Sequence, residues 1–200
     1  IAITGSSGKT SLKEMLGQSL SKICQTSYSK KSFNNKYGVP ISLFNINRGD
    51  KIGIFEVGMD KRGEIDFLTK KIMPNVGVIT NISYAHIKNF QNLKGIARAK
   101  AEIINNIVEN GTVVLNSDDK FFKFFKFKSI KKKLRIISFG IKKKSDVNLI
   151  NIKKGKSTSV IYIKYNKKKL KFIIKKNLEN YIYNILSSLA VLSIYFDLEK

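Results

Sequence analysis

Cysteine, proline and tryptophan are nearly missing from this sequence of 200 residues, which holds one cysteine, two prolines and no tryptophan. A single cysteine, Cys24, excludes a disulfide framework and is typical of a reducing compartment. No apolar run approaches the ~20 residues of a membrane-spanning helix, and no signal peptide precedes the first apolar run. We therefore expect a cytoplasmic protein without membrane insertion.

Acidic residues are also scarce, since 14 Asp and Glu stand against 38 Lys and Arg and give a formal charge of +24. Such an excess is compatible with nucleic-acid binding, because clustered cations release counterions from phosphate backbones. The excess is nearly all lysine and is spread over many segments, which fits a compositional bias on solvated surfaces. We favour this second interpretation and expect no specific nucleic acid partner. A nucleotide-regulated nucleic-acid-binding protein stays as an alternative.

The first eleven residues have the layout of a phosphate-binding loop. A β-branched apolar run leads into a glycine and serine turn, and Lys9 and Thr10 then open a segment with helical periodicity. Backbone N–H groups of such a turn and the positive end of the helix bind phosphate oxygens. Lys9 would reach the terminal phosphates, and the Thr10 hydroxyl would ligate Mg²⁺. The predicted nucleotide-binding residues of this loop are Gly5, Ser6, Ser7, Gly8, Lys9, Thr10 and Ser11.

This loop is shorter than the common G-x-x-x-x-G-K-[ST] pattern, because Ile3 stands where that pattern has its first glycine. A plain serine and glycine turn with a surface lysine is therefore an alternative. The position of the loop between a strand signal and a helix signal favours the phosphate site.

Strand-like and helix-like segments alternate along the chain. The apolar runs at 52–59 and 76–81 are typical of parallel strands covered on both faces. This alternation predicts an α/β protein, a three-layer α/β/α P-loop domain with a mostly parallel sheet. Short alternating runs near residues 147–174 lack helices between them, so we expect a small antiparallel sheet as an insert there. A last helix is predicted from about residue 178 to residue 196.

Polar side chains follow the predicted strands at their carboxyl ends, where ligands collect in this architecture. Glu56 is the one charged residue of its apolar run, which favours metal binding over a plain surface position. Asn81 and His86 follow the next strand. A lone histidine is more often an ordinary loop residue, and only its order relative to Glu56 and Lys100 supports a role. For Asp118 and its neighbour Asp119, a turn or a helix cap is favoured over a Mg²⁺ site.

A lysine lies in the middle of the apolar stripe of the helix predicted over residues 91–109. The stripe consists of Leu93, Ile96, Ala97, Ile104 and Ile107, and Lys100 lies at its centre. A buried lysine has a desolvation cost unless it snorkels, finds a partner or is chemically changed. The pattern leaves snorkelling and a functional role equally open.

Several motifs in a fixed order resemble the central ATP-binding domain of the Mur ligases. The resemblance covers nearly the whole chain, residues 1–200. It is closest to the family members that add D-alanyl-D-alanine to UDP-N-acetylmuramoyl-tripeptide. Besides the phosphate loop, the motifs are Asn34-Asn35 with Gly38-Val39-Pro40, Glu56-Val57-Gly58-Met59 with Gly63-Glu64-Ile65, Ala85-His86, and Ala97-Arg98-Ala99-Lys100-Ala101-Glu102-Ile103.

The resemblance implies ATP-dependent amide bond formation in peptidoglycan precursor synthesis, through an acyl phosphate, with ATP and Mg²⁺ as cofactors. It implies that Thr10, Glu56 and His86 bind metal and that Lys9 binds phosphate. Lys100 matches a lysine that is carbamylated in related ligases and helps to coordinate a second Mg²⁺. A carbamate would replace the buried ammonium with an anion that a cation can neutralise. Lys9, Lys100 and His86 are therefore the expected catalytic residues.

The resemblance also implies that Asn184 contacts adenine and that Asn34 and Asn35 face the UDP-muramyl peptide. The family usually has a histidine four residues before the adenine-contacting asparagine, where this chain has Asn180. The flanking domains of the family have no counterpart in residues 1–200, so we expect this chain alone to bind ATP weakly without turnover. We also expect a monomer. A MurE-like or folylpolyglutamate-synthase-like ligase is the alternative within the superfamily, since it would share the ATP machinery.

Overall fold

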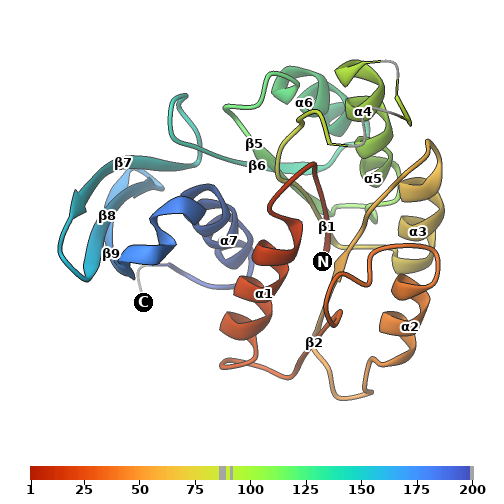
Figure 1. Ribbon diagram of the computed structural model, residues 1–200, viewed down its shortest axis with the longest axis horizontal. Coiled ribbons are helices and arrows are strands. Elements are labelled where there is room, and N and C mark those ends of the chain that lie inside the picture. The colour runs from red at the N-terminus through yellow and green to blue at the C-terminus, as the bar shows by residue number, and fades with distance from the viewer. Residues whose placement is uncertain (86–88, 91, 199–200) are drawn as a thin grey trace.

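The computed structural model describes residues 1–85, 89–90 and 92–198. The sheet of this part of the chain has nine strands in the order β2-β3-β1-β4-β5-β6-β7-β8-β9 (Figure 1). The pairs from β2 to β7 are parallel, and β7, β8 and β9 pair antiparallel. The strands are β1 Ala2–Thr4, β2 Thr26–Tyr28, β3 Ile52–Glu56, β4 Val76–Ile79, β5 Thr112–Asn116, β6 Arg135–Gly140, β7 Val147–Lys154, β8 Thr158–Tyr165 and β9 Lys168–Lys175.

Helices cover both faces of the sheet. Leu12 and Leu16 of α1 share one apolar core with Leu186 of α7, and the other core contains residues of α3, α4, α5 and α6. The predicted three layers are confirmed. Among the described helices, none combines the length and the apolar character needed to cross a membrane. The helices are α1 Lys9–Leu20, α2 Gly38–Phe44, α3 Glu64–Ile72, α4 Leu93–Lys100, α5 Glu102–Asn105, α6 Phe122–Lys131, the 3-10 helix η2 Lys176–Tyr181 and α7 Ile182–Tyr195.

The antiparallel strands continue the main sheet instead of forming a separate one. Phe139 at the end of β6 pairs in parallel with Val147 at the start of β7. The three last strands then curl around α7 (Figure 1), and the buried side chains of Ile161 and Ile163 contribute to the core on that face. The prediction of an antiparallel insert is confirmed, with the correction that β7 joins it to the parallel strands.

Helix α2 and strand β2 were not predicted. Glycine and proline indicated a loop at Gly38-Val39-Pro40, yet these residues form the first turn of α2. Proline is tolerated there because the first N–H groups of a helix have no intrahelical partner. The Asn35 side chain accepts from the N–H groups of Tyr37 and Gly38 at 3.1 and 3.0 Å and thereby caps the helix.

Two predicted helices end differently in the structure. The first was expected to extend to Ile23, but α1 ends at Leu20 and the Ile23 side chain is 57% exposed. The helix expected over 91–109 consists of α4 and the short α5, which are separated at Ala101. The last predicted helix begins as η2 before it becomes α7.

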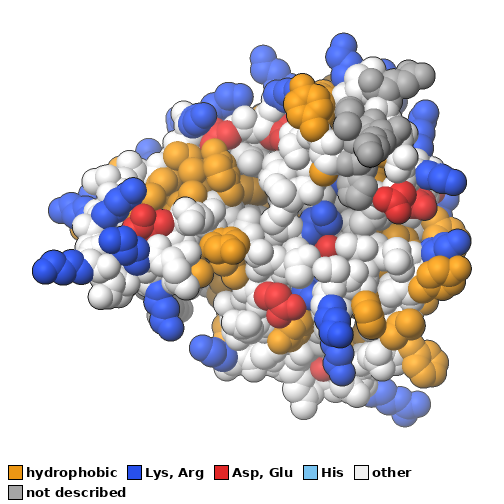
Figure 2. Space-filling view, in the orientation of Figure 1, with side chains coloured by type: hydrophobic (Ala, Val, Ile, Leu, Met, Phe, Trp, Pro, Cys, Tyr) orange, Lys and Arg blue, Asp and Glu red, His pale blue; other side chains and the backbone are white. Residues whose placement is uncertain are grey.

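Positive charge is spread over the surface that Figure 2 shows. Lysine and arginine side chains surround the outline of this face and do not gather in one groove. Strand β9 alone contributes four lysines, at positions 168, 169, 171 and 175. This distribution attracts anions in general without defining a nucleic-acid groove on this face.

Candidate active site

The turn between β1 and α1 depends on two glycines with positive φ. Gly5 has φ 147° and Gly8 has φ 80°, conformations that residues with a side chain rarely adopt. A Cβ on Gly5 would lie 1.8 Å from Thr80 Oγ1, and a Cβ on Gly8 would lie 2.7 Å from Asn184 Oδ1. Backbone conformation and packing therefore both require glycine at these two positions.

Residues that follow β4 fix the shape of this turn. Ser6 N donates to Asn81 O at 2.9 Å, and Ser7 N donates to Asn81 Oδ1 at 3.1 Å. Thr80 Oγ1 donates to Ser7 O at 2.7 Å. The carboxyl ends of neighbouring parallel strands meet at one edge of the sheet, which brings Asn81 to the phosphate loop as the strand pattern indicated. Asn81 thus supports the loop, a role that the sequence did not specify.

Two further side chains contact the loop. Lys9 Nζ donates to Gly5 O at 3.0 Å, and Asn184 Nδ2, from the first turn of α7, donates to Gly8 O at 3.1 Å. Burial lowers the pKa of Lys9, and the negative charge of Glu56 opposes that shift. Asn184 therefore lies at the phosphate loop, whereas Asn180 is exposed in η2.

Glu56 joins the phosphate-binding helix to the loop before α2. Its carboxylate is 1% exposed and accepts Thr10 Oγ1 at 2.7 Å and Asn34 Nδ2 at 2.7 Å, one on each oxygen. A hydroxyl beside a carboxylate is the oxygen donor set that Mg²⁺ takes from proteins when nucleotide phosphates and water complete its shell. The residues present therefore fit Mg²⁺. Among the described residues, no three His, Cys, Asp or Glu side chains are close enough to hold a metal by themselves.

Lys100 is buried at the end of α4, as the apolar stripe predicted, and is 1% exposed. Burial, and after it the positive charge of Lys9, lowers the pKa of Lys100 to about 7. Within the described part of the chain, no side chain or carbonyl forms a hydrogen bond with its Nζ. Near neutral pH a large fraction of this amine is therefore uncharged. His86 lies outside the described residues, so its role stays a prediction.

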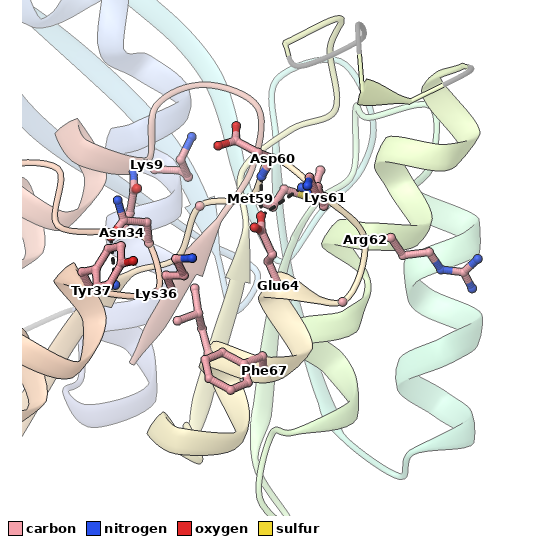
Figure 3. A pocket seen from close by; sticks show the side chains of 14 residues that line it. Lys9, Asn34, Lys36, Tyr37, Met59, Asp60, Lys61, Arg62, Glu64 and Phe67 are labelled. Carbon is pink, nitrogen blue, oxygen red and sulfur yellow. Dashed lines mark hydrogen bonds between the residues drawn. The ribbon is translucent and has the colours of Figure 1, made fainter.

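A cavity of about 630 Å³ lies beside this centre (Figure 3). Lys9, Asn34 and Asn35 line it, and Arg62 points away from the other labelled side chains. Asn34 also reaches Glu56, whereas the Asn35 side chain is used to cap α2. Of the two asparagines predicted to face substrate, only Asn34 connects the cavity to the Thr10 and Glu56 pair.

Two carboxylates shape the wall of the cavity between β3 and α3. Glu64 Oε2 accepts the N–H groups of Asp60 and Lys61 at 2.6 and 2.9 Å. The Glu102 carboxylate accepts Gly63 N at 2.9 and 3.1 Å. Glu102 lies two residues after Lys100, so the helix pair that carries Lys100 also supports this wall. The motifs around these residues were recognised in the sequence, but this function was not.

Asp118 and Asp119 hold turns, as predicted. The Asp118 carboxylate accepts the N–H groups of residues 141–143, and Asp119 accepts those of Ile82 and Phe121. Both carboxylates are therefore occupied by backbone donors. The prediction of a turn or cap in place of a metal site is confirmed.

Residues 3–192 of the chain match the Mur ligase middle domain family. The chain belongs to the Mur ligase family. Among its curated relatives, the UDP-N-acetylmuramoyl-tripeptide–D-alanyl-D-alanine ligase of Buchnera aphidicola from Baizongia pistaciae is 39% identical over 141 residues, 70% of this chain and 30% of the relative. The ligase of the same name from Escherichia coli K12 is 37% identical over 119 residues, 60% of this chain and 26% of the relative.

Solved structures of Mur ligases have the same fold. MurF from Acinetobacter baumannii superposes with a TM-score of 0.91 at 31% identity, over 99% of this chain and 43% of that chain. MurF from Thermotoga maritima in complex with ADP gives 0.87 at 26% identity, over 96% of this chain and 44% of that chain. L. casei FPGS gives 0.74 at 15% identity, which shows the fold alone. Within the family the chain is MurF-like, and it spans about 30% of the length of its Buchnera relative.

Proposed function

We propose that this chain is the ATP-binding module of a ligase that joins D-alanyl-D-alanine to UDP-N-acetylmuramoyl-tripeptide. The observation that carries the proposal is the meeting of Thr10 and Asn34 at the buried carboxylate of Glu56. One donor comes from the phosphate-binding helix and the other from a loop that lines the cavity. Relatives that share this name across several bacteria support the choice of substrates.

In the proposed reaction, the carboxylate of the tripeptide attacks the γ-phosphorus of ATP, which gives an acyl phosphate and ADP. The amine of D-alanyl-D-alanine then attacks the acyl carbon and releases phosphate. The N–H groups of the loop and the charge of Lys9 hold the phosphates in line for this transfer. Thr10 and Glu56 would hold Mg²⁺, which when bound neutralises charge on the phosphoryl group. These nucleotide substrates place the reaction in the cytoplasm.

Lys100 is proposed to be carbamylated, with His86 as a further metal ligand. Carbamate formation needs a neutral amine, whose nitrogen attacks CO₂ and loses a proton. A pKa of about 7, lowered first by burial and then by Lys9, makes that amine available near neutral pH. The resulting anion would turn the repulsion between Lys100 and Lys9 into attraction and would suit a second cation.

Asn184 is proposed to contact the adenine ring, and its position beside Gly8 supports a place at the nucleotide. Asn34 and Asn35 are proposed to face the UDP-muramyl peptide, which the cavity beside them supports.

The test is phosphate release by the whole ligase that contains this chain. We expect release from ATP only when UDP-N-acetylmuramoyl-tripeptide and D-alanyl-D-alanine are both present. Release with the UDP-dipeptide and diaminopimelate instead would support the MurE-like alternative. Absence of release with either substrate pair would contradict a ligase of this kind.

A further inference from the structure

Helix α1 carries a second buried cation that the proposed reaction does not use. Lys13 lies one turn beyond Lys9 and Thr10 and is 0% exposed. Its Nζ donates to Ser29 O at 2.5 Å and to Lys31 O at 2.6 Å. The carboxylate of Glu14 lies 2.8 Å from the same nitrogen. Three oxygens therefore face the three protons of an ammonium that is removed from water, which satisfies it.

The two carbonyls that Lys13 binds belong to the loop that leads from β2 to α2. Three residues beyond Lys31, the same loop presents Asn34 to Glu56. The Asn34 carbonyl also accepts Gly58 N at 2.7 Å. Lys13 thus holds the start of the loop from the phosphate-binding helix, and β3 and the residue after it hold its functional end.

The loop adopts a conformation that needs such support. Lys31 has φ 48°, in the left-handed region that residues other than glycine rarely adopt. Its carbonyl is one of the two that Lys13 binds. Strained backbone of this kind persists only where the surroundings hold it in place. Without the ammonium, two carbonyls would lose their donor and the loop would relax.

We propose that Lys13 is a positioning residue that fixes residues 29–35 so that Asn34 reaches Glu56. Because Lys9, Thr10 and Lys13 share the first turns of one helix, the phosphate site and the substrate-facing loop keep one relative position. The placement rests on the geometry of Lys13 alone. Its effect on substrate binding rests on the proposed function.

Hydrogen exchange on this chain tests the placement directly. The variant Lys13→Met keeps the length of the side chain and removes the donor, Lys13→Gln keeps a shorter donor, and Lys22→Met removes an exposed lysine after α1 as the control. We expect exchange of the amides in residues 29–38 to rise about tenfold in Lys13→Met and less in Lys13→Gln, with the sheet and Lys22→Met unchanged.

Equal acceleration over the whole sheet would show that Lys13 contributes only to global stability and would overturn the proposal. Unchanged exchange in residues 29–38 would also overturn it. If Lys13→Met does not fold, Lys13→Gln decides between the same outcomes, since its amide can reach only part of the loop.

Kinetics of the whole ligase test the consequence. In Lys13→Met we expect the KM for the UDP-muramyl peptide to rise about tenfold, with the KM for ATP and kcat nearly unchanged. Partial recovery of that KM in Lys13→Gln would support positioning, and an equal rise for both substrates would contradict it. If the wild-type ligase releases no phosphate, the proposed function fails, while the exchange result still decides the role of Lys13.

Discussion

Two lysines of this domain are buried on helices, and their surroundings differ in kind. Lys13 on α1 has two carbonyls and a carboxylate around its Nζ. Lys100 on α4 has no hydrogen-bond partner among the described residues, and the charge of Lys9 acts on it. Burial alone therefore does not indicate reactivity. A buried ammonium that oxygens satisfy can hold a structure together, whereas one that faces another cation is driven towards its neutral, nucleophilic form.

The largest effect that separates the two lysines should be on turnover. We expect Lys100→Met to lower kcat of the whole ligase about a thousandfold, because the proposed ligand to the second cation is lost. Lys13→Met should leave kcat nearly unchanged, and Lys94→Met, an exposed position on α4, serves as the control. Phosphate release at saturating substrates measures this. Near wild-type kcat in Lys100→Met would break the comparison.

The pH dependence of stability should also separate them. The pKa of Lys100 is about 7 in the folded chain and 10.5 in the reference state. Between these values the unfolded state binds more protons, so stability rises with pH, by about 1 kcal/mol per pH unit. We expect urea unfolding of the metal-free chain to show this rise from pH 8 to pH 9.

In the same experiment Lys100→Met should flatten the slope, because the group that titrates is gone. Lys13→Met should keep the slope, because Lys100 remains. A slope that survives in Lys100→Met would show that another group is responsible.

The smallest effect is expected at the ion pair of Lys13. Glu14 is 39% exposed, so its charge is screened by solvent. Glu14→Gln should therefore change the free energy of unfolding by less than about 1 kcal/mol. The amides of residues 29–38 should keep their protection, because the two carbonyls still hold Lys13. A loss of protection there would show that the ion pair, and not the carbonyls, places the lysine.

Helical periodicity predicted one of these lysines and should have predicted the other. Lys100 was found because it lies in the middle of an apolar stripe. Lys13 also lies on the buried face of its helix, between Leu20 and Gly17, but it was not considered. Its partners are backbone carbonyls of a loop, and no sequence pattern indicates where a loop carbonyl will lie. The role of Lys13 therefore needed the structure.

The sheet and its site edge were predictable for a physical reason. Parallel strands covered on both faces form nearly continuous apolar runs, and their carboxyl ends meet at one edge. Glu56 and Asn81 could be placed together on that basis. Strand β2 has only three residues and α2 contains glycine and proline, so local pattern was too weak to predict either. The pairing of β6 with β7 depends on a contact between segments that sequence texture had separated.

The most direct test of the proposed nucleotide site is a titration of ATP into this chain with and without Mg²⁺. The wild-type chain is expected to bind ATP only weakly, and Mg²⁺ should strengthen that binding. Glu56→Gln should remove the Mg²⁺ effect, because the carboxylate beside Thr10 is then neutral, and Lys13→Met should retain it. Equal binding with and without Mg²⁺, or an undiminished Mg²⁺ effect in Glu56→Gln, would contradict the assignment of Thr10 and Glu56 to the metal and phosphates of ATP.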